Sequence, residues 1–316
     1  MNGSRIEIIA PSGALLSPER FMRALDFLRA HGHEVRCQVP AQPWQRFSAP
    51  DDERLAQIER AARRRDIDAV MITRGGYGLS RLLDRIDWEQ VAASAASGVR
   101  WVGYSDFTAF QLALLARADA VSFAGPGVSG DFGVDVPDAL MLESFDALLH
   151  GQLLPVHWPR PATVADTPGR RIAVDGVLWG GNLSLVAAAV GTPYLPRPEA
   201  GILFLEDVGE HPYRIERMLH QLYHAGVLGA QRAIVLGSFT EWKPAAHDGG
   251  YDLAAVVDYF RQRLAAPIIT GLPFGHVPRK VVLGVGVRYR LEEAGTDWLL
   301  TPLEPDVGAA AGKPFR

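Results

Sequence analysis

The stretch VGYSDFTAFQLALLARA, residues 102–118, joins an apolar run directly to a helical pattern. The run ends in Gly-Tyr-Ser-Asp at 103–106, and the helix is expected to begin at once. Short apolar strands that pass straight into helices are typical of a parallel sheet with both faces covered. Ser105 at this junction is either a helix N-cap or a nucleophile held at a sharp turn, and the residues alone favour the cap.

The same alternation of strands and helices runs through residues 5–150. Helices are expected over 17–32, where Ser17 is the cap, and over 51–65, where acids precede bases. Strands are expected at residues 5–13, 34–40, 68–76, 99–105 and 120–126. Right-handed crossovers between such strands predict a doubly wound, flavodoxin-like parallel α/β domain over residues 1–150.

The pattern changes after residue 150. Residues 151–170 are rich in proline and lack periodicity, so we expect a linker there. Residues 171–316 predict a second, mixed α/β domain with a frayed tail from 304 onward. Its expected strands are 171–181, 201–209, 232–239 and 280–293, and its clearest helices are 212–226 and 251–264.

Composition excludes several classes of function. The chain has 316 residues and a net charge of −4, which does not favour a nucleic-acid partner or an anionic membrane surface. The sequence contains no apolar run long enough to span a membrane, and its N-terminus is interpreted as a first strand rather than a signal peptide. The lone Cys37 forms no internal disulfide, and no Cys/His cluster has zinc spacing. A cytoplasmic enzyme or binding protein is therefore expected.

Two loops of the first domain lie where a parallel sheet binds ligands, outside the carboxyl ends of its strands. One is TRGGYG at 73–78, and the other is GYSD at 103–106. The glycines of the first loop either make a turn or bring backbone N–H groups close to an anion. Neither loop matches a nucleotide-binding motif.

A serine nucleophile needs a base, and the base needs an orienting carboxylate. His276, in the loop LPFGHVPRK, is the best candidate base among the nine histidines. Glu206 and Asp207 follow four apolar residues at a strand end and are both candidate acids. Alternation places them on opposite faces of the strand, so only one of them meets His276. Spacing alone leaves the choice open.

Seven motifs together give a specific resemblance. They are APSG at 10–13, RGGYG at 74–78, GYSD at 103–106, GGNLSL at 180–185, GTPY at 191–194, ILFLEDVGEHPYRIERML at 202–219 and GLPFGH at 271–276. In this order the chain resembles the LD-carboxypeptidase family, serine peptidases that include muramoyl-tetrapeptide carboxypeptidase and the microcin C immunity protein. The resemblance extends from residue 5 to about residue 303.

The resemblance implies a Ser–His–Glu triad. It assigns the nucleophile to Ser105, the base to His276 and the orienting carboxylate to Glu206. The backbone N–H groups of Asp106 and Gly76 are the implied oxyanion hole. Because the family carries its nucleophile in the first domain and its acid and base in the second, the active site is expected in the cleft between them.

The candidate substrate-binding residues are Arg74, Gly75, Tyr104 and Asn182, with Arg279 a weaker one. A guanidinium binds a carboxylate through a bidentate fork, so Arg74 is the candidate for the substrate carboxylate. The alternative for Arg74 is a structural ion pair. The alternative for Asn182, in GGNL, is a turn or cap role.

The implied reaction removes the terminal D-alanine from the murein tetrapeptide during cytoplasmic wall recycling. No cofactor and no metal are expected, and the implied assembly is a homodimer. Within the family the alternative is an immunity-type hydrolase of peptidyl-nucleotides, for which Trp158 and Trp242 are candidate aromatic platforms. An alternative of another class is a binding protein that uses the cleft without turnover.

Overall fold

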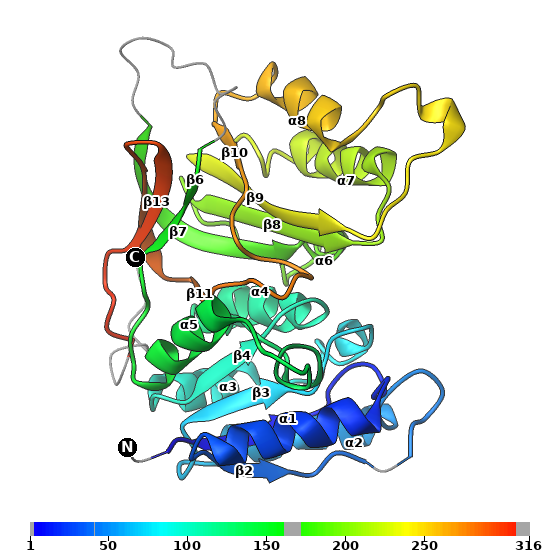
Figure 1. Ribbon diagram of the computed structural model, residues 1–316, viewed down its shortest axis with the longest axis vertical. Coiled ribbons are helices and arrows are strands. Elements are labelled where there is room, and N and C mark those ends of the chain that lie inside the picture. The colour runs from blue at the N-terminus through cyan, green and yellow to red at the C-terminus, as the bar shows by residue number, and fades with distance from the viewer. Residues whose placement is uncertain (1–2, 41, 161–171, 308–316) are drawn as a thin grey trace.

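The computed structural model describes residues 3–40, 42–160 and 172–307. It contains two stacked sheets, one built mainly from the first half of the chain and the other mainly from the second half (Figure 1). The two layers meet over helix α4 (Phe107–Ala118), which packs against strand β7 and helix α6 of the second layer.

The first sheet has the strand order β11-β5-β4-β3-β1-β2. Its first five strands in sequence pair in parallel in the order 2-1-3-4-5, which is the flavodoxin-like arrangement, so the predicted fold class is confirmed. The strands are β1 (Arg5–Ile9), β2 (Glu34–Cys37), β3 (Ala69–Ile72), β4 (Arg100–Gly103), β5 (Ser122–Ala124) and β11 (Leu283–Val285).

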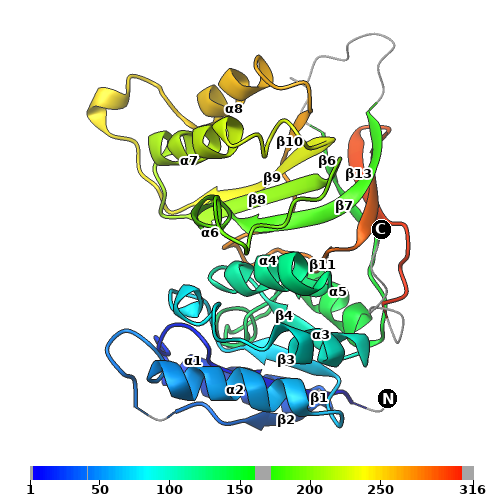
Figure 2. The ribbon, with the colours of Figure 1, turned by 180° about the vertical axis from the view of Figure 1, so that it is seen from behind.

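Helices cover both faces of this sheet. Helices α1 and α5 lie on the face seen in Figure 1, and α2 and α3 lie on the face seen in Figure 2. Ser17 caps α1 by accepting a hydrogen bond from the Arg20 N–H, as expected. The bounds are α1 (Pro18–Ala30), α2 (Asp51–Arg63), α3 (Trp88–Ala96) and α5 (Ala139–Leu149).

The second sheet is mixed, with the order β10-β9-β8-β7-β12-β13-β6. Strands β7 to β10 pair in parallel and carry helices α6, α7 and α8, whereas β12, β13 and β6 pair antiparallel. The bounds are β6 (Val156–Pro159), β7 (Ala173–Asn182), β8 (Ile202–Val208), β9 (Ala233–Thr240), β10 (Ile268–Thr270), β12 (Arg288–Ala294), β13 (Asp297–Pro302), α6 (Leu183–Ala188), α7 (Pro212–His224) and α8 (Leu253–Arg261).

Three local expectations differ from the structure. Residues 156–159, expected in the linker, form β6 against β13. The expected strand 280–293 is divided at Gly286, whose φ of 94° turns the chain out of the first sheet and into the second. The tail is anchored as far as Val307, whose N–H donates to Gly151 O. Residues 161–171 and 308–316 lie outside the described residues, and the domain boundaries at 150 and 171 stay a prediction.

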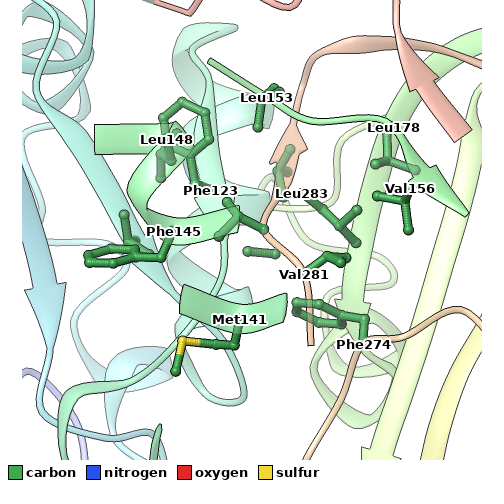
Figure 3. Packing of buried hydrophobic residues seen from close by; sticks show 14 of the residues in the cluster. Phe123, Met141, Phe145, Leu148, Leu153, Val156, Leu178, Phe274, Val281 and Leu283 are labelled. Atoms are coloured by element: carbon green, nitrogen blue, oxygen red, sulfur yellow. The ribbon is translucent and has the colours of Figure 1, made fainter. Parts of the chain in front are cut away.

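One buried apolar cluster extends from the first layer into the second. Figure 3 shows Phe145 and Leu148 of α5, Phe123 of β5 and, further along, Leu283 and Phe274. Phe274 is 1% exposed and stands two residues before His276. The core therefore anchors the loop that carries the expected catalytic base.

Candidate active site

Ser105 occupies a strained turn between β4 and α4. Its φ is 63°, in the left-handed region that costs a residue with a Cβ of the order of 1 kcal/mol or more. A Cβ on Gly103 would lie 2.8 Å from Phe107, and a Cβ on Gly75 would lie 2.6 Å from the Ser105 hydroxyl oxygen. The turn thus needs small neighbours, and it has the form of a nucleophile elbow.

The side chain of Ser105 does not cap helix α4. Asp106 occupies the N-cap position and makes no side-chain cap hydrogen bond, while the Ser105 carbonyl accepts the Thr108 N–H at 2.9 Å. The Ser105 hydroxyl instead lies 3.0 Å from His276 Nε2. Of the two interpretations of Ser105, the geometry favours the nucleophile.

The loop that carries His276 is seated in an irregularity of the second sheet. The register between β8 and β9 shifts after Leu205, and Ser238 there donates its N–H to Phe274 O at 2.8 Å. A Cβ on Gly237 would lie 2.4 Å from the same carbonyl oxygen. Gly275 has a φ of 138°. Glycine at both positions allows the loop to approach the strand ends closely.

Three residues that are distant in sequence form one hydrogen-bonded relay. His276 Nδ1 lies 2.7 Å from Glu206 Oε2, and Nε2 lies 3.0 Å from Ser105 Oγ. A carboxylate only accepts, so Nδ1 carries the proton donated to Glu206, and Nε2 accepts the serine hydroxyl proton. Glu206 is completely buried, whereas His276 is partly exposed. Such a relay can activate the serine for attack on a carbonyl carbon.

Of the two adjacent acids Glu206 and Asp207, only Glu206 bonds to His276, as strand alternation predicts. Asp207 accepts hydrogen bonds from the backbone N–H and the hydroxyl of Ser184, at 2.9 and 2.7 Å. Asn182 Nδ2 links the two acids, 3.2 Å from Glu206 Oε1 and 2.8 Å from Asp207 Oδ1. Asn182 also caps α6 and is 4% exposed. It therefore lies behind the relay, in contact with its carboxylate.

Asp106 ties the elbow to two other loops of the first layer. Its Oδ2 accepts the Ser12 hydroxyl at 2.7 Å and the Leu79 N–H at 2.9 Å. Burial raises the pKa of the Asp106 carboxyl above its ordinary value. The first bond gives the serine of the APSG motif a structural role. The second holds the glycine loop 73–78 beside Ser105, and in this loop Gly76 has a φ of 104°. The backbone N–H of Asp106 meanwhile stands at the start of α4, where a helix favours negative charge.

A pocket of about 190 Å³ opens beside the relay. Its described lining residues are Leu16, Ser17, Arg20, Arg74, Gly75, Gly76, Tyr104, Ser105, Gly127, Ser129, Gly130 and His276. Two of these carry a positive charge and none is an acid. A larger cavity of about 670 Å³ lies at the other end of α4, and its lining includes no member of the relay.

Arg74 is the half-buried cation of the pocket. Burial lowers the pKa of its guanidinium, which nevertheless stays charged at neutral pH. Nη1 donates to Ala14 O at 3.1 Å, and Arg74 makes no ion pair within the described part of the chain. Arg279, the weaker candidate, is exposed and does not line the pocket. The geometry thus leaves Arg74 available to a substrate anion.

Two parts of the pocket lining, one wall and one rim, are not among the site residues predicted from the sequence. The wall is Gly127–Gly130, which follows β5, and the rim is Leu16–Arg20 at the start of α1. The signal for the wall was available, because the carboxyl end of β5 lies at the same sheet edge as those of β3 and β4.

The two tryptophans considered as aromatic platforms lie elsewhere. Trp158 is 3% exposed and donates its indole N–H to Thr270 O. Trp242 contacts the ring of His211. Neither is among the lining residues of the pocket.

Comparison with known proteins shows the family of this chain. The model of the LD-carboxypeptidase N-terminal domain matches residues 6–125, and that of the C-terminal domain matches residues 175–291. The murein tetrapeptide carboxypeptidase of Pseudomonas aeruginosa is 32% identical over 86% of this chain and 88% of its own. The chain belongs to the LD-carboxypeptidase family. This LD-carboxypeptidase is therefore an enzyme, a serine carboxypeptidase.

Solved structures give the same result. The muramoyltetrapeptide carboxypeptidase of Oxalobacter formigenes has a TM-score of 0.85 and 42% identity, and covers 94% of this chain and 98% of its own. The wild-type microcin C7 self-immunity protein MccF has a TM-score of 0.83 at 22% identity, covering 95% and 96%, and this likeness shows the fold alone. Among the described helices of this LD-carboxypeptidase, none has the length and hydropathy to cross a membrane.

Proposed function

We propose that this LD-carboxypeptidase removes the terminal D-alanine of murein tetrapeptides, in cytoplasmic peptidoglycan recycling, through an acyl-enzyme. The observation that carries the proposal is the relay from Glu206 through His276 to Ser105 at the edge of a basic pocket. Two similar proteins are named for tetrapeptide cleavage, which supports the choice of substrate.

The steps follow from the geometry. Ser105 Oγ attacks the carbonyl carbon before the terminal residue while His276 Nε2 takes the hydroxyl proton. The Glu206 carboxylate stabilises the imidazolium that forms. The backbone N–H groups of Asp106 and Gly76 hold the oxyanion. The imidazolium then protonates the departing amine of D-alanine, and water attacks the ester to release the shortened peptide and free Ser105.

The pocket's charge supports a peptide substrate that carries several carboxylates. Arg74 lines the pocket, half-buried and without an ion pair in the described residues, which supports a role in binding the terminal carboxylate. Arg20 at the rim adds a second positive charge, and no acid lines the described pocket. A tetrapeptide with D-glutamate and diaminopimelate has carboxylates to match both cations.

The reaction is expected to be stereospecific. If Arg74 fixes the terminal carboxylate and the N–H groups fix the scissile carbonyl, the methyl group of L-alanine falls where D-alanine has its hydrogen. Loss of one charged hydrogen bond costs about 1.5–3 kcal/mol, which is more than tenfold in rate. Mass spectrometry of two purified tetrapeptides that differ only at the last α-carbon should therefore show kcat/KM at least tenfold higher for D-alanine.

Three further outcomes test the proposed function. Similar kcat/KM values for both tetrapeptides would refute the LD-carboxypeptidase specificity. Rapid cleavage of a peptidyl-nucleotide, with both tetrapeptides left intact, would favour the immunity-type hydrolase. If a fluorophosphonate fails to label Ser105, the assignment of Ser105 as the nucleophile is wrong. The variant Arg74→Gln tests the binding of the terminal carboxylate separately. Because it removes the charged hydrogen bond, it should lower kcat/KM for the D-alanine peptide about tenfold or more, mainly by raising KM.

A homodimer is also proposed, from the family resemblance and from the frequency of two-fold dimers among soluble oligomers. Multi-angle light scattering at micromolar concentration should give twice the 34.4 kDa mass of one chain. A mass equal to one chain would contradict this proposal.

A further inference from the structure

A buried ion pair lies behind the active site and has no role in the steps above. Lys280 Nζ lies 2.6 Å from Asp131 Oδ1, and the two side chains are 1% and 5% exposed. Removing two charges from water is costly, and a well-packed apolar pair of similar volume often gives equal stability. Stability alone therefore does not account for a charged pair at this position.

The acid of the pair holds one wall of the substrate pocket. Asp131 belongs to the π-helical turn Val128–Phe132, and its Oδ2 accepts the Gly127 N–H at 2.8 Å. In the same segment Ser129 donates its N–H to Thr73 O at 2.9 Å. Asp131, which is not among the described lining residues of the pocket, thus fixes the backbone of the wall 127–130.

The base of the pair belongs to the chain segment that carries His276. Lys280 lies four residues after His276, just before β11. Its Nζ also lies 4.0 Å from the ring centroid of Tyr104, the residue before Ser105. The Tyr104 ring is in turn 5.0 Å from the His276 ring. Burial raises the pKa of Tyr104 well above its ordinary value, so the phenol beside the ammonium stays neutral.

The relay itself needs His276 from one half of the chain to meet Ser105 from the other. Besides the 3.0 Å hydrogen bond between them, the buried Lys280–Asp131 pair joins the segment after His276 to the loop after β5. The Val282 N–H also donates to Ser144 Oγ at 2.7 Å, and this bond joins the same segment to α5. Tyr104 stands between the Lys280–Asp131 pair and the relay. Misplacement of a reacting group by about 1 Å costs about 100-fold in rate.

We infer that Lys280 and Asp131 are positioning residues, which clamp the His276 loop and the wall 127–130 together and hold Tyr104 against the His276 ring. Neither touches the reacting atoms. They act by keeping His276 Nε2 within hydrogen-bond distance of Ser105. The inference rests on the proposed function only in taking Ser105 as the nucleophile, and not on the identity of the peptide.

The test uses the rate at which a fluorophosphonate labels Ser105, because labelling reports the activated serine without any peptide substrate. Lys280→Met and Asp131→Asn should each lower the labelling rate about 10- to 100-fold. Each single variant also leaves an unpaired buried group, so its melting temperature should fall. Val256→Ala, a buried position in α8 away from the pocket, is the control for lost stability alone.

The double variant Asp131→Asn/Lys280→Met separates positioning from stability. With no unpaired charge left, it should recover much of the lost melting temperature, yet its labelling should stay at least tenfold slow. If the double variant or either single variant is labelled at the wild-type rate, the inference is overturned. The inference would also be overturned if Val256→Ala, at the same melting temperature as the single variants, lost as much of its labelling rate as they do. A wild-type enzyme that labels quickly but leaves the tetrapeptide intact would refute the proposed function and not the clamp.

Discussion

Ser105→Ala is expected to lower kcat on the tetrapeptide by at least about 10⁴-fold while the protein stays folded. The change removes the only atom of the relay that can attack the carbonyl. It leaves the elbow, the Asp106 anchor and the His276–Glu206 hydrogen bond in place. Mass-spectrometric product analysis with circular dichroism of the same sample measures both quantities.

Ser105→Gly is the matched control for the strained backbone. Glycine adopts a φ of 63° without the Cβ penalty, so this variant should be at least as stable as Ser105→Ala and equally inactive. If Ser105→Ala and Ser105→Gly differ in stability but are both inactive, the loss of turnover is due to the missing hydroxyl. Turnover near the wild-type rate in either variant would remove Ser105 from the nucleophile role.

Glu206→Gln is expected to lower kcat by about 10³- to 10⁴-fold. The neutral amide no longer stabilises the imidazolium, and its NH₂ group can turn toward His276 Nδ1 and reverse the tautomer that the serine requires. The Asn182 amide, 3.2 Å from Oε1, retains a partner in either state. Steady-state kinetics together with the fluorophosphonate labelling rate measures the effect.

Asp207→Asn supplies the comparison, because the two acids are adjacent, both buried and share Asn182. Asp207 accepts two hydrogen bonds from Ser184, so its loss should lower the free energy of unfolding by about 1–3 kcal/mol. Its kcat should fall less than tenfold. A larger kcat loss in Asp207→Asn than in Glu206→Gln would transfer the orienting role to Asp207. Small and equal kcat losses in the two variants would exclude both acids from that role.

Local sequence patterns predicted the order of the elements well. The short apolar strands of the first half, which alternate with helices, specify a parallel sheet because both of its faces must be covered. The second half was harder to predict. Residues 280–293 are apolar enough for one strand, but they contribute β11 to the first sheet and β12 to the second. The positive φ of Gly286 allows the chain to turn between the two strands. Residues 156–159 pair with a strand more than 130 positions away, which no local window contains.

For the site, strand alternation alone predicted that only one of Glu206 and Asp207 meets the base, and the strand–helix junction alone predicted that Ser105 stands at a turn. The tertiary structure decided which acid faces the base. It also decided that Ser105 bonds to His276 rather than to its own helix. His276 and Ser105 are separated by 171 residues, and their distance depends on the packing of two sheets and on the glycines that let the His276 loop approach. Long-range contacts of this kind arise only when the whole core is assembled, because local propensity carries no information about which distant loop packs beside a given turn.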